Sequence, residues 1–290
     1  MSRRVLITGA TGVLGRAIIT RLSSNPRGDL VIYSPGRRDE LDPLDLRYCE
    51  QIFDAIIRTK PDLIIHLAAT FSSDFDEAFT VNVNSAWHIL KTIEELSLST
   101  RVLLIGSAAE YGVVSADENP IMESRSLRPV SIYGLTKAWQ TDLGYLYATR
   151  GVNVVMARIF NLIGPHLSER LFIGRLHRQI KELLSGDRKK IEVGPLSAVR
   201  DYISVNDAVT QLLAIADYGE AGEVYHVASG EPITMRDLLA QELAAHGLED
   251  SIVIEGVGLS NRQGYDVPSI YAEMSKTMSL LKKWGCHVTN

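Results

Sequence analysis

The feature that most constrains how this chain can fold is a glycine-rich turn that directly follows its first apolar run. Residues 5–7 lead into the segment Thr8-Gly9-Ala10-Thr11-Gly12-Val13-Leu14-Gly15, and a helical pattern begins at once. In such a strand-turn-helix the first glycine permits a tight turn, the second lets the backbone approach a pyrophosphate, and the third lets the helix pack on the strand. The helix N-terminus then faces the anion. The turn therefore predicts a dinucleotide site that comprises Gly9, Thr11, Gly12, Val13, Leu14 and Gly15.

Short β-branched runs alternate with amphipathic stretches through the first half of the chain. Continuous apolar runs are typical of buried parallel strands, and apolar residues spaced three and four apart are typical of helices. The expected strands are 5–7, 30–33, 63–67, 102–105 and 154–157, and the expected helices are 13–22, 47–58, 85–96 and 132–147. This alternation predicts an α/β fold with a Rossmann-type, doubly wound parallel sheet.

The regular alternation of strand and helix patterns ends after Gly164-Pro165. We expect a helix over 171–184, then a strand and helix within 200–218 with the helix capped near Asn206, and one more strand over 224–228. The last strand suggests that the chain returns to the first sheet. We therefore expect an NAD(P)-binding domain of residues 1–164 plus about 200–228, and a smaller C-terminal α/β substrate domain of about 165–199 plus 229–290.

Charge and hydropathy narrow the class of protein. The formal net charge is −5 and the pI about 5.8, so no overall basic field exists to attract nucleic acid or an anionic membrane. The apolar runs are far shorter than the roughly 20 residues of a membrane span. The start of the chain leaves no room for a signal peptide, so we expect a cytoplasmic protein. Cys49 and Cys286 have no neighbours at metal-ligand spacing, and we interpret both as ordinary thiols with no metal site.

Two further segments bear on the cofactor. Asp45-Leu46 precedes the helix that leads to the third strand, and its carboxylate could accept the adenine amino group; a helix N-cap would suit Asp45 equally well. After the second strand stands Ser34-Pro35-Gly36-Arg37-Arg38, where enzymes that prefer NAD place an acid against the ribose hydroxyls. Basic groups suit a 2′-phosphate, so Arg37 and Arg38 favour NADP, although Asp39 and Glu40 follow closely and leave NAD open.

The candidate catalytic residues are Ser107, Tyr133 and Lys137. Tyr133 and Lys137 are four apart on one expected helix and so share a face. A phenol is a poor acid or base at neutral pH, but a nearby ammonium and a positively charged nicotinamide lower its pKa and make proton exchange with a carbonyl practicable. Ser107 follows the strand 102–105 at the carboxyl edge of the sheet, where its hydroxyl can bond the same carbonyl oxygen.

Several motifs in order resemble the extended short-chain dehydrogenase/reductase family over nearly the whole chain. Besides TGATGVLG they are HLAA from His66, NVNSAWHIL from Asn82, GSAAEYG from Gly106, YGLTK from Tyr133, RIFNLIGP from Arg158 and RDYISVNDAV from Arg200. The resemblance implies a nucleotide-diphosphate sugar as substrate. It implies further cofactor contacts at Leu67, Ala68, Ala69, Asn82, Tyr133, Lys137 and Phe160, and substrate contacts at Ser107, Ala108, Tyr133, Asn161 and Arg200, with Arg200 on the pyrophosphate. Taken alone, Asn161 could be a turn residue and Arg200 the partner of Asp201.

Departures from the family pattern narrow the chemistry. The runs RVLLIGSAAEYG, SLRPVSIYGLTK and IEVGPLSAVRDY most resemble GDP-4-keto-6-deoxymannose reductases. The 4,6-dehydratases of the family carry an Asp-Glu pair where this chain has Ala108-Ala109, and related epimerase-reductases have a Cys at the second of these positions. Hydride chemistry at C4 remains, so we expect reduction of the C4 ketone of a nucleotide-linked 4-keto-6-deoxyhexose. The alternatives are an NAD-dependent 4-epimerase and a non-catalytic NADP-binding sensor, although such sensors usually lose the Tyr or the Lys.

Other polar residues near the site receive structural roles. We expect His66 to pack under the cofactor, and Glu110 and Tyr111 to support the site or position the substrate. The expected helices from Ser85 and from Ile132 carry apolar groups beyond the sheet-facing stripe, with Trp87 and Trp139 prominent. These surplus apolar groups, together with the pairing of family members through these helices, predict a homodimer.

Overall fold

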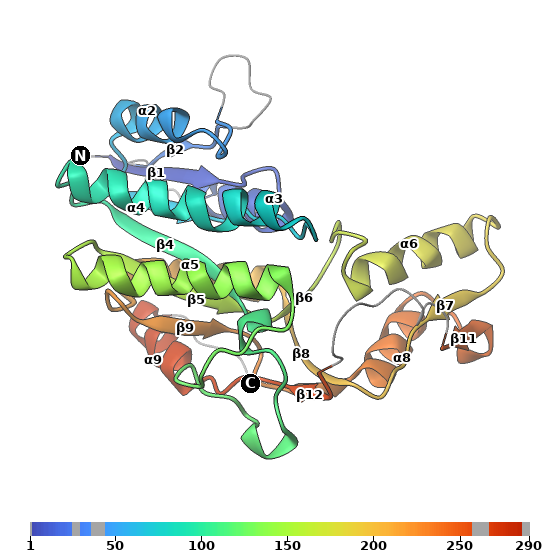
Figure 1. Cartoon of the computed structure of the whole chain (residues 1–290). Helices are drawn as coiled ribbons and strands as arrows, with labels where there is room; N and C mark the ends of the chain where they lie inside the picture. Colours follow the sequence, from blue (N-terminus) through green and yellow to red (C-terminus); the bar gives the residue numbers. More distant parts are fainter. Residues whose placement is uncertain (1, 25–29, 36–43, 257–266, 286–290) are drawn as a thin grey trace.

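A six-stranded parallel sheet forms the centre of the computed structural model, which describes residues 2–24, 30–35, 44–256 and 267–285 (Figure 1). The strand order is β2-β1-β3-β4-β5-β9, and every neighbouring pair is parallel. The bounds are β1 Arg3–Thr8, β2 Leu30–Tyr33, β3 Leu63–His66, β4 Arg101–Ser107, β5 Val154–Ile159 and β9 Val224–Val227. Because the chain reverses its direction of travel across the sheet after β2, the connections that follow β1 and β3 lead to opposite faces of the sheet and leave a crevice where such sheets bind ligands.

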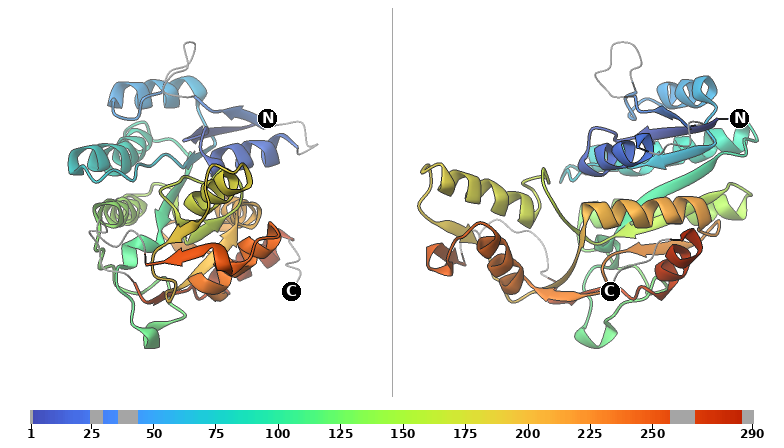
Figure 2. Two further views of the ribbon diagram at one scale, coloured as in Figure 1. Left: turned by 90° about the vertical axis from the view of Figure 1, so that its right-hand side faces the viewer. Right: turned by 180° about the vertical axis from the view of Figure 1, so that it is seen from behind.

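Helices cover both faces of this sheet and bury two apolar layers. One face packs α1 (Val13–Ser23), α7 (Val205–Tyr218) and α9 (Ser275–Trp284), and Figure 2 shows them together in the view from behind. The opposite face carries α2 (Cys49–Thr59), α4 (Ser85–Glu95) and α5 (Ile132–Thr149). A short α3 (Phe75–Phe79) and a π-helical turn over 80–84 run directly into α4. The doubly wound parallel sheet expected from the sequence is confirmed.

A smaller region lies at the carboxyl edge of the main sheet (Figure 1). Its mixed sheet contains β10 (Pro232–Thr234), β8 (Val199–Ser204) and β12 (Ser269–Ile270), and β6 (Asn161–Ile163) pairs with β8. Helices α6 (Phe172–Leu184) and α8 (Met235–Ala245) enclose a separate apolar core with the parallel pair β7 (Ile191–Val193) and β11 (Val253–Glu255). Short 3-10 helices occupy 108–111, 116–118 and 250–252.

Two boundaries differ from the sequence expectations. The cap of α7 is Ser204, whose hydroxyl accepts from the Asp207 amide, and not Asn206, which lies inside the first turn. The expectation also placed all of 229–290 in the smaller domain, whereas α9 packs against α7 and β9. The reason is apolar burial, since Leu280 joins the core of the main sheet.

No described helix is both long and apolar enough to cross a membrane. Within the described part of the chain, no group of three or more His, Cys, Asp or Glu side chains is placed to hold a metal ion. Cys49 is a free, half-buried thiol at the start of α2, and Cys286 lies outside the described residues.

Candidate active site

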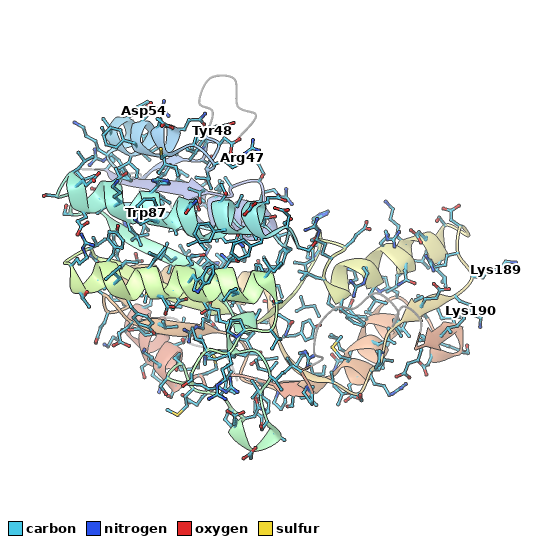
Figure 3. The ribbon with its side chains drawn as sticks, viewed as in Figure 1. Arg47, Tyr48, Asp54, Trp87, Lys189 and Lys190 are labelled. Carbon is cyan, nitrogen blue, oxygen red and sulfur yellow. The ribbon has the colours of Figure 1, made fainter. Side chains whose placement is uncertain are left out.

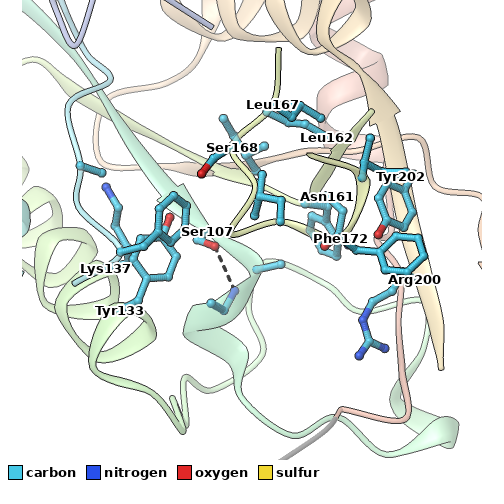
Figure 4. A pocket seen from close by; sticks show the side chains of 18 of the residues that line it. Ser107, Tyr133, Lys137, Asn161, Leu162, Leu167, Ser168, Phe172, Arg200 and Tyr202 are labelled. Atoms are coloured by element: carbon cyan, nitrogen blue, oxygen red, sulfur yellow. Dashed lines mark hydrogen bonds between the residues drawn. The ribbon is translucent and has the colours of Figure 1, made fainter. Parts of the chain in front are cut away.

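A cavity of about 730 Å³ lies between the carboxyl edge of the main sheet and the smaller region. Cavities of about 300–1,000 Å³ are typical of small-molecule sites. Figure 4 shows Ser107, Tyr133 and Lys137 together on one side and Arg200 and Tyr202 on the other. The expected residues that line it are Gly9, Gly12, Val13, Leu14, Gly15, Leu67, Ala69, Ser107, Ala108, Tyr133, Lys137, Phe160, Asn161 and Arg200.

The glycine loop lines this cavity where β1 ends. Gly9 has φ +70°, a conformation that side chains other than glycine rarely adopt, and a Cβ built there would lie 2.7 Å from the Ala68 backbone nitrogen. A Cβ on Gly15 would lie 2.5 Å from the Gly9 carbonyl oxygen. The N-cap of α1 is Gly12, which has no side chain to cap the first turn. Backbone atoms therefore occupy the space that a side chain at Gly9 or Gly15 would need. The amide groups at the N-terminus of α1 remain available for an anion such as a pyrophosphate.

A smaller cavity of about 220 Å³ adjoins the loop and is lined by Thr11, Asp45, Leu46 and Ala68. The Asp45 carboxylate is mostly buried and accepts from the Arg47 guanidinium through both oxygens. The alternative role of Asp45 as a helix N-cap is wrong, because α2 begins later, at Cys49, and its cap is Tyr48. Arg37 and Arg38 lie outside the described residues.

Ser107 ends β4 with its hydroxyl directed into the cavity. Its Oγ accepts from the Ala109 amide at 3.2 Å, drawn as a dashed line in Figure 4, and the Tyr133 phenol lies beside it. Tyr133 lies in the first turn of α5, where Ser131 caps the helix through the Gly134 amide. Burial raises the pKa of Tyr133 to about 12, and the adjacent Ser107 hydroxyl opposes that shift. The phenol therefore keeps its proton through neutral pH, and this shift is opposite in direction to the lowering of its pKa expected from the sequence.

Lys137 is the most deeply buried member of the trio, with only 1% of its surface exposed. Its Nζ donates to the Ile105 carbonyl and to Gln140 Oε1, each at 2.8 Å. Burial lowers the pKa of Lys137 to about 8, while the Glu110 carboxylate acts in the opposite direction. From the sequence we expect the Lys137 ammonium to act on the Tyr133 phenol one turn away. In the structure the hydrogen bonds of this ammonium go to the Ile105 carbonyl on β4 and to Gln140 on α5.

A buried carboxylate ties the two elements that carry the catalytic residues to β5. Glu110 accepts from the Ser107 amide at 2.7 Å, from the Thr141 hydroxyl at 2.9 Å and from Arg158 Nε at 2.7 Å, and so joins β4, α5 and β5. Arg158 also donates to Tyr111 Oη, which lies 2.6 Å from His226 Nε2. Glu110 and Tyr111 are fully buried, in agreement with their expected supporting role.

Asn82 and His66 support the cavity without lining it. Asn82 bonds the Thr70 backbone amide and carbonyl, and its Nδ2 also donates to the Thr136 hydroxyl on α5. The amide group is therefore committed to holding the loop after β3 against α5, and the cofactor contact expected of Asn82 does not fit this arrangement. His66 is fully buried between Thr8 and Ser85, and burial lowers its pKa to about 3, which suits the packing role expected for it.

The wall from the smaller region carries Asn161 and Arg200. The Asn161 Nδ2 donates to the Asp201 carbonyl at 3.0 Å. Arg200 lines the cavity from β8 (Figure 4), and its Nη1 donates to the Val199 carbonyl. The Asp201 carboxylate accepts from other groups, namely Ser229, Gly230 and Ala272. Neighbouring residues on a strand point to opposite faces, which separates Arg200 from Asp201.

Sequence patterns missed several residues that shape the cavity. The Phe71 ring lies over the Tyr133 ring, with centroids 4.4 Å apart. Two other missed aromatic groups, Phe172 and Tyr202, line the cavity from the smaller region. Gln140 was missed as a partner of Lys137. The available signal for Gln140 was its position, three residues after the lysine on the same helix face.

The chain is similar in sequence to a known protein family and to characterised relatives. Residues 5–228 match the model of the NAD dependent epimerase/dehydratase family. The chain is 30% identical over 246 residues to GDP-6-deoxy-D-mannose reductase of Pseudomonas aeruginosa, covering 82% of this chain and 79% of that protein. It is 26% identical over 285 residues to GDP-6-deoxy-D-talose 4-dehydrogenase of Aggregatibacter actinomycetemcomitans, covering 96% and 91%.

Solved structures share the fold over nearly the whole length of the chain. The structure of RMD from Pseudomonas aeruginosa complexed with NADPH has a TM-score of 0.85 at 24% identity and covers 100% of this chain and 94% of that one. MoeE5 in complex with UDP-glucose and NAD has a TM-score of 0.79 at 26% identity, with 96% and 92% covered.

Proposed function

The chain belongs to the NAD dependent epimerase/dehydratase family, and we propose that it is an NAD(P)H-dependent 4-ketoreductase of nucleotide-linked 4-keto-6-deoxyhexoses. One observation carries the proposal. Ser107 and Tyr133 lie beside each other in the cavity, while Ala108 and Ala109, which follow Ser107, line the same cavity without any ionisable group. A site of this kind can protonate a carbonyl oxygen, but these two alanines provide no acid-base pair for elimination.

The chain's own residues perform the proton part of the reduction. When bound, the nicotinamide supplies a hydride to the ketone carbon. The Ser107 and Tyr133 hydroxyls hold the C4 oxygen, and the Tyr133 proton passes to it as the alcohol forms. Lys137 lies one turn further along α5, and the positive charge of its ammonium stabilises the resulting phenolate across that distance and not through a hydrogen bond that the structure shows. Ketone, hydride and proton together give the C4 alcohol.

The two walls of the cavity differ in the groups they offer, and this difference assigns the cofactor to one wall and the substrate to the other. We assign the glycine loop and the smaller cavity beside it to the dinucleotide, because the loop offers backbone amides and a helix N-terminus. The region of 165–199 and the segment from 229 through α8 then form the substrate domain. Arg200 meets the pyrophosphate of the nucleotide sugar, since a guanidinium suits phosphate oxygens, and Asn161 lies beside it.

NADPH is the proposed coenzyme, although similar structures are bound to NAD as well as to NADPH. The basic pair Arg37 and Arg38 follows β2 in the sequence, where a 2′-phosphate would lie. This pair is the feature that favours NADPH over NADH.

A cytoplasmic homodimer is the proposed form of the enzyme. Trp87 projects from α4 (Figure 3), and Phe75, Tyr145 and Leu146 are also exposed on α3 and α5. Trp139 contributes less than expected to this surface, because its ring packs edge-on against Phe75 and Phe79. Sedimentation of the purified protein as a monomer at micromolar concentration would contradict the proposed dimer.

Loss of absorbance from NADPH is the direct test. The purified protein is mixed with NADPH and either GDP-4-keto-6-deoxymannose or its dTDP-linked analogue, and the product is identified by NMR. We expect a stoichiometric C4 alcohol from one of the two. An enzyme isolated with tightly held NAD that interconverts C4 epimers without consuming NADPH would establish the 4-epimerase alternative instead.

A further inference from the structure

The hydrogen bonds of the buried Lys137 ammonium go to groups other than Ser107 and Tyr133. Its Nζ has two acceptors at 2.8 Å, the Ile105 carbonyl on β4 and Gln140 Oε1 on α5. Gln140 is itself 1% exposed, and its Nε2 donates to the same carbonyl at 3.3 Å. An ammonium has three donors, so these two bonds leave one N–H for the cavity that Lys137 lines.

We propose that Gln140 is a positioning residue that sets both the direction and the charge state of the Lys137 ammonium. Gln140 bonds both the ammonium and the Ile105 carbonyl. It therefore fixes the direction in which the remaining N–H of the ammonium points into the cavity. This inference rests on the proposed reductase function only for its effect on turnover. The contact itself is a property of the folded chain.

The neutrality of Gln140 matters because the charged groups around Lys137 are few and already paired. Among the residues that the structure describes, the titratable groups that face this region are Tyr133 on α5, His66 on β3 and Glu110 after β4. Tyr133 and His66 are buried and uncharged at neutral pH, and Glu110 is already paired with Arg158. A neutral amide acceptor holds the ammonium without adding a carboxylate, which would raise the lysine pKa further.

Two substitutions should therefore move the lysine pKa in opposite directions. Gln140→Glu places a carboxylate at the same position and should raise the pKa of Lys137, which burial holds near 8, by about 1 unit or more. Gln140→Met keeps the volume but removes the acceptor, which disfavours the charged form and should lower the pKa by about half a unit or more.

Thr141→Val is the matched control. Thr141 is the next residue on α5, is equally buried, and donates to Glu110 and not to Lys137. Its substitution removes one buried hydrogen bond at the same depth in the same helix. A general loosening of α5 would affect Thr141→Val and Gln140→Met alike, whereas a specific effect on Lys137 would affect only the Gln140 variants.

The experiment measures the lysine pKa directly, by NMR titration of protein that contains lysine labelled at Cε, with Lys137→Met to assign the signal. Thermal melting first establishes that each variant is folded. We expect an upward shift in Gln140→Glu, a downward shift in Gln140→Met and no shift in Thr141→Val. The basic limb of the kcat/KM profile with NADPH should move in the same two directions. Shifts of the same sign in both Gln140 variants, an unmoved pKa, or an equal shift in Thr141→Val would overturn the proposal.

The outcomes separate this inference from the proposed function. If the wild-type protein reduces no nucleotide-linked ketone, the reductase proposal fails, and the NMR titration still decides the role of Gln140. If turnover is observed but the titration shows no opposed shifts, Gln140 is only a packing residue and the reductase proposal stands.

Discussion

The two walls of the cavity are built in different ways. The wall from the main sheet carries Lys137, Gln140 and Glu110, all nearly or completely buried and each bonded to a neighbouring element. The wall from the smaller region carries Asn161, Arg200 and Tyr202, which are only partly buried and come from β6 and β8. Buried and fully paired polar groups are costly to rearrange, while partly exposed ones adapt easily. We therefore expect the first wall to fix the reaction, and the second wall to accept changes in substrate without disturbing the first.

Tyr133→Phe should have the largest effect, because it removes the proposed proton donor from the first wall. The ring and its packing against Phe71 remain, but the transferable proton is lost. We expect turnover to fall by about a thousandfold or more, because general acid catalysis contributes factors of this order. Affinity for NADPH, measured by fluorescence titration, should stay near that of the wild type. Turnover within about tenfold of the wild type would remove Tyr133 from the chemistry.

Arg158→Met tests the buried pairing of the first wall through stability. The substitution leaves the Glu110 carboxylate without its guanidinium partner, and the Arg158 and Glu110 side chains are almost fully buried, at 2% and 0% exposure. Breaking such a pair from one side costs about 3 kcal/mol in free energy of unfolding. Urea denaturation measures this loss. The double variant Glu110→Gln, Arg158→Met should recover part of it, and a single-variant loss below about 1 kcal/mol would contradict the described network.

Arg200→Ala tests the second wall and should behave in the opposite way. We expect the KM for the nucleotide sugar to rise by about ten- to a hundredfold, because a charge-assisted contact with phosphate is lost. The melting temperature and NADPH affinity should stay close to wild type. A variant that melts early, or that binds the nucleoside diphosphate as well as its parent does, would show that Arg200 serves the fold.

The smallest effect concerns the coenzyme. The double substitution Arg37→Ala, Arg38→Ala should weaken NADPH by about tenfold relative to NADH, because only NADPH carries the 2′-phosphate that these side chains would meet. Dissociation constants for both coenzymes measure the preference. Equal loss for NADPH and NADH would argue against the NADP assignment.

The sequence predicted the first wall better than the second for a physical reason. The glycine turn, the strand alternation and the spacing of Tyr133 and Lys137 are local patterns, and a local pattern can be recognised without a fold. The hydrogen bonds of Asn82 go to Thr70 and to Thr136, which are remote along the chain. The pairing of Asp45 with Arg47 is local, but the sequence analysis did not consider it, because a carboxylate before an expected helix also fits an N-cap.

Helix α6 of the smaller region was predicted, but most of its strands were not, because they are short and depend on partners far away in the sequence. Strand β8 takes β6, β10 and β12 as neighbours, and none of these exceeds three residues. Periodicity needs longer segments to be visible. The position of α9 against the main sheet likewise follows from tertiary burial of Leu280 and not from its own pattern.

The path of the chain between its two regions has an evolutionary consequence. It passes outward after β5, returns between β8 and α7, leaves again between β9 and β10, and comes back between β12 and α9. A substrate region attached at a single junction could be exchanged between enzymes by one recombination event. Here a chimera would have to match every one of these junctions, so we expect new substrate preferences to arise more easily by point substitution along the second wall than by exchange of the whole region.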